Sequence, residues 1–340
     1  MKNKEQLILN CLLEHEQLSS SKLSDITEIA LRTTQRELNE LKEKGYIEVT
    51  GVGRATVNNL TSLGMMNVEL DTRFTSEKRL EDMYIRRFNE DVFNGFKQMD
   101  IFYECKSKLD LYAMRYQVKV KKSTPSLIKR ELERLIIEFS WKSSQIEGNT
   151  YSLLETEELI LNNITDKSKH TTIETQMILN HKKALEFIYS EPEYFKVITT
   201  KKIIELHKIL TENMDINPGF RKGGVGITGS LFKPLDNNFA IQEMMDKTCE
   251  LINAKSPYEK AFLASIMISY IQPFEDGNKR TSRILSNALL YAHNLPMLSF
   301  RSVKVEDYRT AILAFYEFNS IVLYKKIYLS QISYFVENYF

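Results

Sequence analysis

Residues 271–283 read IQPFEDGNKRTSR and bring together side chains that suit the binding of a phosphorylated ligand. The apolar run AFLASIMISY precedes this stretch, and the run RILSNALLYAH begins at its last residue. Pro273, Gly277 and Asn278 interrupt the helical pattern between the two runs. The sequence therefore predicts a loop between two buried helices. The loop ends at a helix N-terminus, where backbone N–H groups can bind an anion.

The composition of this loop favours a nucleoside triphosphate with a divalent cation. The candidate phosphate-binding residues are Gly277, Asn278, Lys279, Arg280 and Arg283. The two arginines share a helix face with Asn287, because they lie at i, i+3 and i+7. Asp276 supplies a hard oxygen ligand for Mg²⁺ beside them. The alternative is a helix–loop–helix corner with two solvated arginines.

The stretch resembles the motif of Fic-domain proteins, HPFx[DE]GNGRxxR. The matching residues are Pro273, Phe274, Asp276, Gly277, Asn278, Arg280 and Arg283. Most members of that family are protein adenylyltransferases, which transfer AMP from ATP to a protein hydroxyl. The resemblance implies ATP and Mg²⁺ as cofactors, with Asp276 as the metal ligand. It also implies a target protein that presents a Tyr, Ser or Thr hydroxyl, this chain itself included.

Two positions depart from the motif, and both affect the expected chemistry. Gln272 occupies the catalytic position of the family histidine, which removes the proton from the attacking hydroxyl. A glutamine amide cannot take up that proton, and a general base contributes roughly 10²–10⁴-fold in rate. Lys279 replaces the second glycine and resembles the Doc-type branch, whose members transfer a phosphate. The resemblance thus implies impaired or altered catalysis, and the alternatives are Doc-like phosphotransfer and a catalytically inactive regulator that responds to nucleotide and binds DNA.

The run SSQIEGN resembles the inhibitory motif of the same family, [ST]xxxE[GN]. The matches are Ser143, Glu147 and Gly148, within an inhibitory helix expected near residues 140–148. In the family this glutamate pairs with the last arginine of the motif, here Arg283. A carboxylate on that arginine removes a partner of the γ-phosphate, so the resemblance implies autoinhibition. The alternative is an ordinary capped helix end.

A glycine-rich segment at residues 221–234 resembles the family flap. Its sequence predicts a short β-hairpin around Thr228 and Gly229. In the family role, Ile227, Thr228 and Gly229 would bind an extended target segment by β-augmentation. The alternative is an ordinary exposed hairpin.

The N-terminal residues predict three short helices followed by a small hairpin, which resembles a winged helix-turn-helix. The candidate DNA contacts are Arg32, Gln35, Arg36 and Asn39 on the third helix and Arg54 at the wing. Between Met1 and Leu60, nine acidic side chains face eight basic ones. This balance is poor for binding to phosphates, so protein contact or regulation is the alternative role.

We therefore expect a mainly α protein: a Fic-type helical bundle with a small β-hairpin flap, plus an N-terminal winged helix-turn-helix. The expected domains are the winged helix at 1–70, a helical connector at 71–125 and the Fic domain at 126–340. A net charge of +1 gives no indication of membrane binding, and no apolar run reaches the roughly 18 residues of a membrane span. Cys11, Cys105 and Cys249 are distant from one another and odd in number, which favours a reducing cytoplasm. A homodimer is left open.

Overall fold

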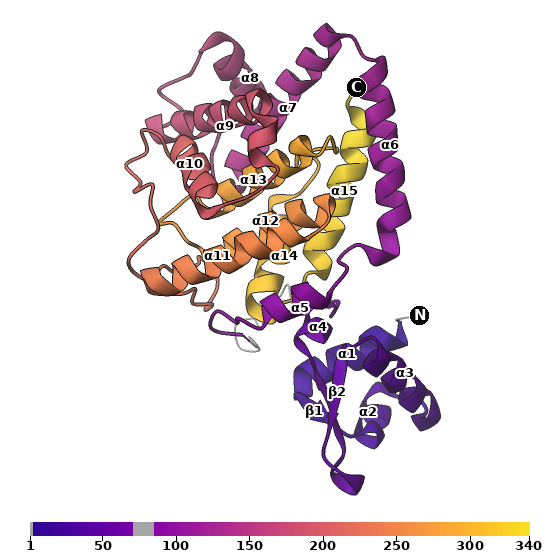
Figure 1. Ribbon diagram of the computed structural model, residues 1–340. Coiled ribbons are helices and arrows are strands. Elements are labelled where there is room, and N and C mark those ends of the chain that lie inside the picture. The colour runs from indigo at the N-terminus through magenta and orange to yellow at the C-terminus, as the bar shows by residue number, and fades with distance from the viewer. Residues whose placement is uncertain (1–2, 71–84) are drawn as a thin grey trace. The chain divides into compact units, whose positions relative to one another are not determined.

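The structure, a computed structural model, describes residues 3–70 and 85–340 (Figure 1). Contacts between residues divide the chain into two compact units. The first contains residues 1–100, 227–232 and 310–326, and the second contains residues 101–226, 233–309 and 327–340. Helices form most of both units, as the sequence predicts. The predicted connector is divided between them, and residues 71–84 lie outside the described part.

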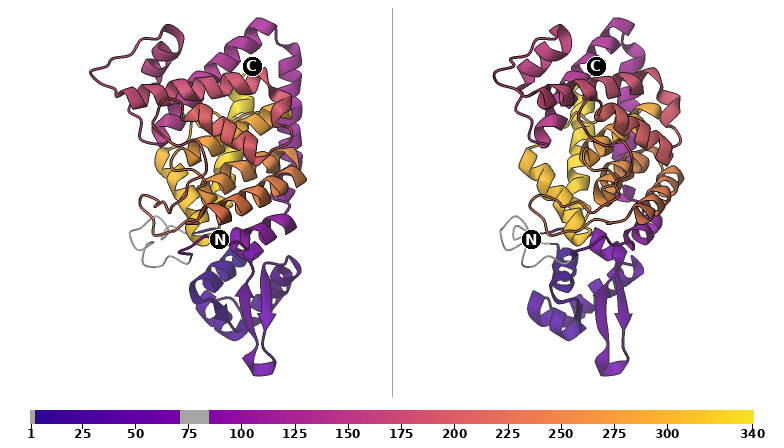
Figure 2. Two further views of the ribbon diagram at one scale, coloured as in Figure 1. Left: turned by 60° about the vertical axis from the view of Figure 1, so that its left-hand side comes forward. Right: turned by 90° about the vertical axis from the view of Figure 1, so that its left-hand side faces the viewer.

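The first unit begins with a winged helix-turn-helix. Its elements are α1 (Lys4–His15), β1 (Gln17–Leu18), α2 (Ser20–Thr27), α3 (Leu31–Glu43), β2 (Ile47–Thr50), η1 (Gly53–Ala55) and β3 (Val57–Leu60). The side chain of Ser19 caps α2 by accepting a hydrogen bond from the Lys22 N–H. Gly45, with φ +72°, lets the chain leave α3. The three strands form an antiparallel sheet in the order β1-β3-β2, and Figure 2 shows the β2–β3 hairpin projecting beside the helices.

The remaining elements of the first unit follow the wing or return from later in the chain. They are α4 (Ser62–Met66), α5 (Val92–Gln98), the larger part of α14 (Val305–Phe318) and the first residues of α15 (Val322–Asn338). Residues 227–232 also belong to this unit. Their turn is closed by a hydrogen bond from the Ser230 N–H to the Ile227 carbonyl (3.1 Å), with Gly229 at φ +77°.

The sequence predicted a β-hairpin at residues 221–234, and the structure has its turn but not its paired strands. All of these residues are described, and no two of their segments pair with each other as strands. Gly223, Gly224 and Gly226 precede the turn and Pro234 follows it. Glycine weakens a strand and proline removes a ladder donor, so the segment does not sustain a ladder.

The second unit is built around two helices, α12 (Pro257–Ile271) and α13 (Asn278–Ala292). From Tyr258 to Ile271 nearly every residue of α12 is buried, in keeping with its mainly apolar sequence from Ala261 onward. The surrounding elements are η4 (Tyr103–Cys105), α6 (Lys106–Lys122), α7 (Pro125–Ile146), α8 (Leu153–Asn162), α9 (Thr172–Ser190), η5 (Pro192–Phe195), α10 (Thr200–Leu210) and α11 (Asn238–Ala254). Capping boxes, such as Ser256 with Glu259, fix where α8, α9 and α12 begin.

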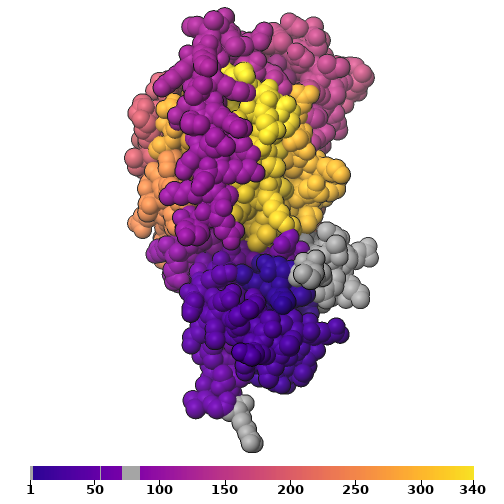
Figure 3. Space-filling model, turned by 90° about the vertical axis from the view of Figure 1, so that its right-hand side faces the viewer, coloured from indigo at the N-terminus to yellow at the C-terminus, as the bar shows by residue number. Residues whose placement is uncertain are grey.

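Helix α6 lies along the C-terminal part of α15, as Figure 3 shows on one face of the second unit. The Tyr112 hydroxyl lies 2.8 Å from the Ser333 hydroxyl, and the Tyr116 ring packs edge-on against Phe335. Lys119 donates to carbonyls near the end of α15. In the described part of the chain, no helix has both the length and the apolar character needed to cross a bilayer.

The close approach of α4 to the loop before β2 leads to a stability prediction. A Cβ added at Gly64 would lie 2.0 Å from the Tyr46 carbonyl oxygen. We expect Gly64→Ala to lower the free energy of unfolding by about 1–3 kcal/mol, as overpacking does. Gly223→Ala is the matched control, because its Cβ meets nothing within 4 Å. Urea titration followed by circular dichroism measures both, and equal stabilities would contradict the packing of α4.

Candidate functional site

The loop between α12 and α13 is held in shape by two left-handed residues and one asparagine. Gln272 ends α12 at φ 53°, and Gly277 precedes α13 at φ 79°. The Asn278 side chain accepts from the Phe274 N–H and donates to the Phe274 carbonyl, both at 2.8 Å. The loop therefore turns back on itself and presents the N-terminus of α13, as the sequence predicts.

Gln272 is 9% exposed, and its amide is engaged at both ends. Its Nε2 donates to the Ser269 carbonyl (2.6 Å), and its Oε1 accepts from Asn278 Nδ2 (2.9 Å). The side chain thus stabilises the loop, and it offers no group that accepts a proton near neutral pH.

Arg221 holds the backbone of the same loop, a role that the sequence analysis missed. This buried guanidinium donates to the Gln272 carbonyl (2.6 Å), to the Leu235 carbonyl (2.5 Å) and to the Gly223 carbonyl. One cation therefore joins three chain segments at the C-terminal end of α12, where a positive charge complements the helix dipole. The position of Arg221 between a turn and a glycine run is the only sequence signal for it.

The two motif arginines bind different partners. Arg280 Nη2 forms an ion pair with Asp276 Oδ2 (2.9 Å), and its Nη1 lies 3.4 Å from the Met214 sulfur. Both arginines are buried. Asn287, expected on the same helix face, instead exchanges hydrogen bonds with the backbone of Leu298 (2.8 and 2.9 Å) and so fixes the chain after α13.

Arg283 is fully buried and binds the end of α7. Its Nη2 forms an ion pair with Glu147 Oε1 (2.8 Å) and donates to the Ser143 carbonyl (2.9 Å). Its Nε donates to Ser143 Oγ (3.0 Å), and its Nη1 donates to the Tyr308 hydroxyl (3.2 Å). Gly148, at φ +94°, turns the chain away after the glutamate. The structure thus contains the Glu147–Arg283 pair that the sequence resemblance implied.

Glu147 also binds a second cation, which the sequence did not indicate. Lys279 Nζ lies 2.9 Å from Glu147 Oε2, so each carboxylate oxygen has its own positive partner. Burial of Glu147 opposes its ionisation, but the charges of Arg283 and Lys279 outweigh burial and lower its pKa to about 2. The carboxylate is therefore ionised across the physiological pH range, and the contact does not respond to pH there.

Asp276 fits the ligand preferences of Mg²⁺. Its Oδ1 accepts from the Gly277 N–H and its Oδ2 binds Arg280, yet its side chain is 68% exposed. A carboxylate oxygen has more than one lone pair, so both oxygens can also reach a cation on the solvent side. Mg²⁺ is usually bound by one or two carboxylates together with substrate phosphates.

His207 packs behind the loop. Its ring stacks on Phe274 with 3.6 Å between centroids, and its Nε2 lies 3.0 Å from the Asp276 carbonyl oxygen. Burial lowers the pKa of His207 to about 4. The ring is therefore neutral at physiological pH and supports the backbone of the motif.

The remaining predicted site residues lie in the first unit. Thr228 and Gly229 are exposed at the turn of residues 227–232, and Ile227 is half-buried. On α3, the exposed residues that lie on one face are Arg32, Gln35, Arg36 and Asn39. Arg36 pairs with Glu37 (2.9 Å) and Glu40 (3.7 Å). Arg54 lies in η1, and its side chain is outside the described part.

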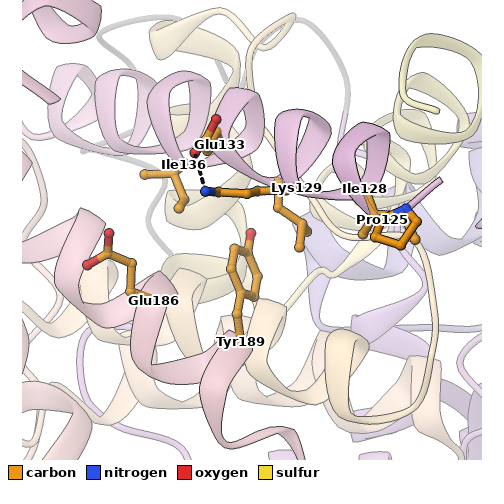
Figure 4. A pocket seen from close by; sticks show the side chains of 8 residues that line it. Pro125, Ile128, Lys129, Glu133, Ile136, Glu186 and Tyr189 are labelled. Carbon is orange, nitrogen blue, oxygen red and sulfur yellow. Dashed lines mark ion pairs between the residues drawn. The ribbon is translucent and has the colours of Figure 1, made fainter. Parts of the chain in front are cut away.

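A groove of about 440 Å³ between α7 and α9 is separate from this site. Its lining is mostly apolar, and Figure 4 shows Tyr189 from α9 pointing toward Lys129 and Glu133 on α7. Neither the motif arginines nor Glu147 line it. The groove therefore shares no lining residue with the contacts of Arg280, Arg283 and Glu147 described above.

Comparison with known proteins agrees with this geometry. Residues 197–290 match the Fic/DOC family, and residues 1–48 match a family of winged helix-turn-helix DNA-binding domains. The protein adenylyltransferase Fic of Drosophila mojavensis is 30% identical over 178 residues, which cover 50% of this chain and 35% of the relative. Its counterpart in Aedes aegypti is 30% identical over 181 residues, with 51% and 36% covered. The chain thus spans little more than a third of these relatives.

Solved structures show the same fold. A Fic-domain signaling protein from Bacteroides thetaiotaomicron aligns with a TM-score of 0.57 and 22% identity, covering 67% of this chain and 94% of that one. Fic-1 from C. elegans (residues 134–508) aligns with a TM-score of 0.61 and 16% identity, covering 74% of this chain and 76% of that one. Residues 197–290 therefore match the Fic/DOC family in sequence, the chain shares the fold of these Fic proteins, and residues 1–48 match winged helix-turn-helix domains.

Proposed function

We propose that this chain binds ATP with Mg²⁺ at the start of α13 and transfers AMP slowly to a hydroxyl of a target protein, under inhibition by Glu147. The observation that carries the proposal is the buried Arg283, whose guanidinium is held by a carboxylate at 2.8 Å. A buried cation beside a helix N-terminus suits a phosphate, and the carboxylate occupies that place. The named relatives, which are adenylyltransferases, support AMP as the transferred group.

The residues around the loop would share the work of binding. Backbone N–H groups of Gly277, Asn278 and Lys279 would hold the α- and β-phosphates, since the first N–H groups of a helix lack intrahelical partners. Arg280 and Arg283 would hold the β- and γ-phosphates. Asp276 would bind Mg²⁺, which supplies charge neutralisation of the phosphates. Ile227, Thr228 and Gly229 would bind an extended segment of the target.

The proton balance of the reaction explains why transfer would be slow. The target oxygen forms a bond to the α-phosphorus, the bond to the β-phosphate oxygen breaks, and pyrophosphate leaves. The hydroxyl proton must pass to a base, and the amide of Gln272 cannot take it. Water at the open side of the site would accept it, without the advantage of a positioned base.

Doc-like phosphotransfer through Lys279 is the alternative chemistry. Lys279 Nζ binds Glu147 in this structure, so departure of the carboxylate would leave the charge of this lysine to the phosphates. The two chemistries differ in the atom attacked: AMP transfer labels the target from α-labelled ATP, and phosphotransfer labels it from γ-labelled ATP.

Removing the carboxylate tests the inhibition. We expect Glu147→Gly and Glu147→Gln to tighten ATP binding about 10–100-fold, because each frees Arg283 from a charge-assisted contact of roughly 1.5–3 kcal/mol. Isothermal titration calorimetry with ATP and Mg²⁺ measures the change. Glu133→Gln, a charge loss at an exposed position of the same helix, is the control. Equal affinity in the Glu147 variants and the control would contradict the inhibition.

Restoring a base tests the role of Gln272. In the Glu147→Gly background we expect Gln272→His to raise transfer of the α-label by roughly 10²–10⁴-fold, the usual contribution of a general base. Histidine tolerates the left-handed backbone at this position. Gln272→Asn, which has no base, is the control. No gain over that control would show that proton removal does not limit the reaction, and transfer of the γ-label alone would favour phosphotransfer.

DNA binding by the winged helix is a second candidate function. The match of residues 1–48 and the exposed polar face of α3 favour it. We expect the double substitution Arg32→Ala and Asn39→Ala to abolish retention of the chain on random-sequence DNA at low salt. Lys22→Ala, an exposed change outside α3, is the control. Unchanged retention in the double variant would rule out α3 as the DNA-reading helix.

A further inference from the structure

A series of hydrogen bonds leads from Arg283 into α9, on the side away from Glu147. Arg283 Nε lies 3.0 Å from Ser143 Oγ, which lies 2.9 Å from His181 Nε2. His181 Nδ1 lies 2.7 Å from the Met177 carbonyl oxygen. Arg283, Ser143 and His181 are each 0% exposed, so water does not compete for these bonds. The sequence analysis did not single out His181.

The chemistry of the partners fixes the direction of every bond in the series. The Met177 carbonyl can only accept, so Nδ1 of His181 carries the proton. Burial, together with the nearby charges of Arg280 and Arg283, lowers the pKa of His181 to about 3, so the ring is neutral and Nε2 must accept. Ser143 therefore donates its hydroxyl proton to His181. Arginine has no acceptor, so the oxygen of Ser143 receives the bond from Arg283.

This arrangement aims the lone pair of Ser143 at the arginine. Without an acceptor at position 181, the hydroxyl of Ser143 is free to rotate, and Arg283 would lose a well-directed partner. Ser144 Oγ lies 3.5 Å from Nδ1 of His181, the nitrogen that carries the proton, so it does not replace Ser143 as the donor to Nε2. The hydrogen bond between Ser143, near the end of α7, and Arg283 thus depends on the His181 ring of α9.

We propose that His181 is a positioning residue for the inhibitory contact. It orients the Ser143 hydroxyl, and through Ser143 it holds the Arg283 guanidinium where Glu147 can pair with it. The inference rests on the proposed function, because it describes the regulation of the same site. His181 touches neither Glu147 nor the loop at residues 272–278 in this series of bonds. Its effect on nucleotide binding is therefore transmitted through Ser143.

The test is a double-mutant cycle, which separates coupling from general damage. His181→Phe keeps a ring of similar size beside Phe139 and removes the acceptor. We expect it to tighten ATP binding about three- to tenfold, the size of one neutral hydrogen bond, and to have no effect in the Glu147→Gly background. His181→Gln, which retains an acceptor able to reach Ser143, should keep most of the inhibition. Calorimetry with ATP and Mg²⁺ measures all variants.

A purely structural role for His181 predicts a different pattern. His181→Phe would then change ATP affinity equally with Glu147 present and in the Glu147→Gly background. That result, or no change in either background, overturns the inference. Should His181→Phe fail to fold, Ser143→Ala breaks the series from the other end, and the same tightening with the same loss of effect in Glu147→Gly is expected. If Glu147→Gly itself leaves ATP affinity unchanged, the proposed inhibition fails first. If Glu147→Gly tightens binding and neither second variant does, only the role of His181 fails.

Discussion

Burial of the Arg283 guanidinium is the constraint on which the site depends. A buried cation is expensive unless its donors are matched by acceptors and its charge is balanced. The end of α7 supplies both, since Ser143 contributes two oxygens and Glu147 a charge. This requirement places α7 against α13 and explains why α7 ends where it does. Gly148 has a left-handed conformation, so the chain turns away from α7 directly after Glu147, the residue that pairs with Arg283.

The loop before α13 presents the N-terminus of that helix, and side chains from both ends of the loop hold its shape. The Arg221 side chain binds the Gln272 carbonyl at the start of the loop, and the Asn278 side chain binds the Phe274 backbone from its end. Asn278 also donates to the side chain of Gln272. The Gln272 side chain therefore takes part in holding the loop and offers no group that accepts a proton near neutral pH.

Sequence reasoning was strongest where local chemistry decides the structure. The breakers at Pro273 and Gly277 predicted the loop, and the resemblance implied the partner of Glu147. It did not indicate the contacts that three-dimensional neighbours decide: the Lys279 amine binds Glu147, Arg280 binds Asp276, and Asn287 binds the backbone of Leu298. Arg221 and His181 act through contacts that no spacing predicts. The prediction of paired strands at residues 221–234 was wrong, because alternating apolar residues among glycines do not ensure a ladder of backbone hydrogen bonds.

Under the proposed function, the Glu147 carboxylate would compete with a phosphate for Arg283, and it could not diffuse away because both residues lie on one polypeptide. An intramolecular ligand has an effective concentration that is independent of the solution, commonly in the millimolar range or above. A triphosphate entering this site would have to exchange with it, and its apparent affinity would equal the intrinsic affinity multiplied by the fraction of time that the carboxylate is absent. Dilution or dialysis leaves that competition unchanged, whereas any event that moves the end of α7 by the length of one ion pair would relieve it.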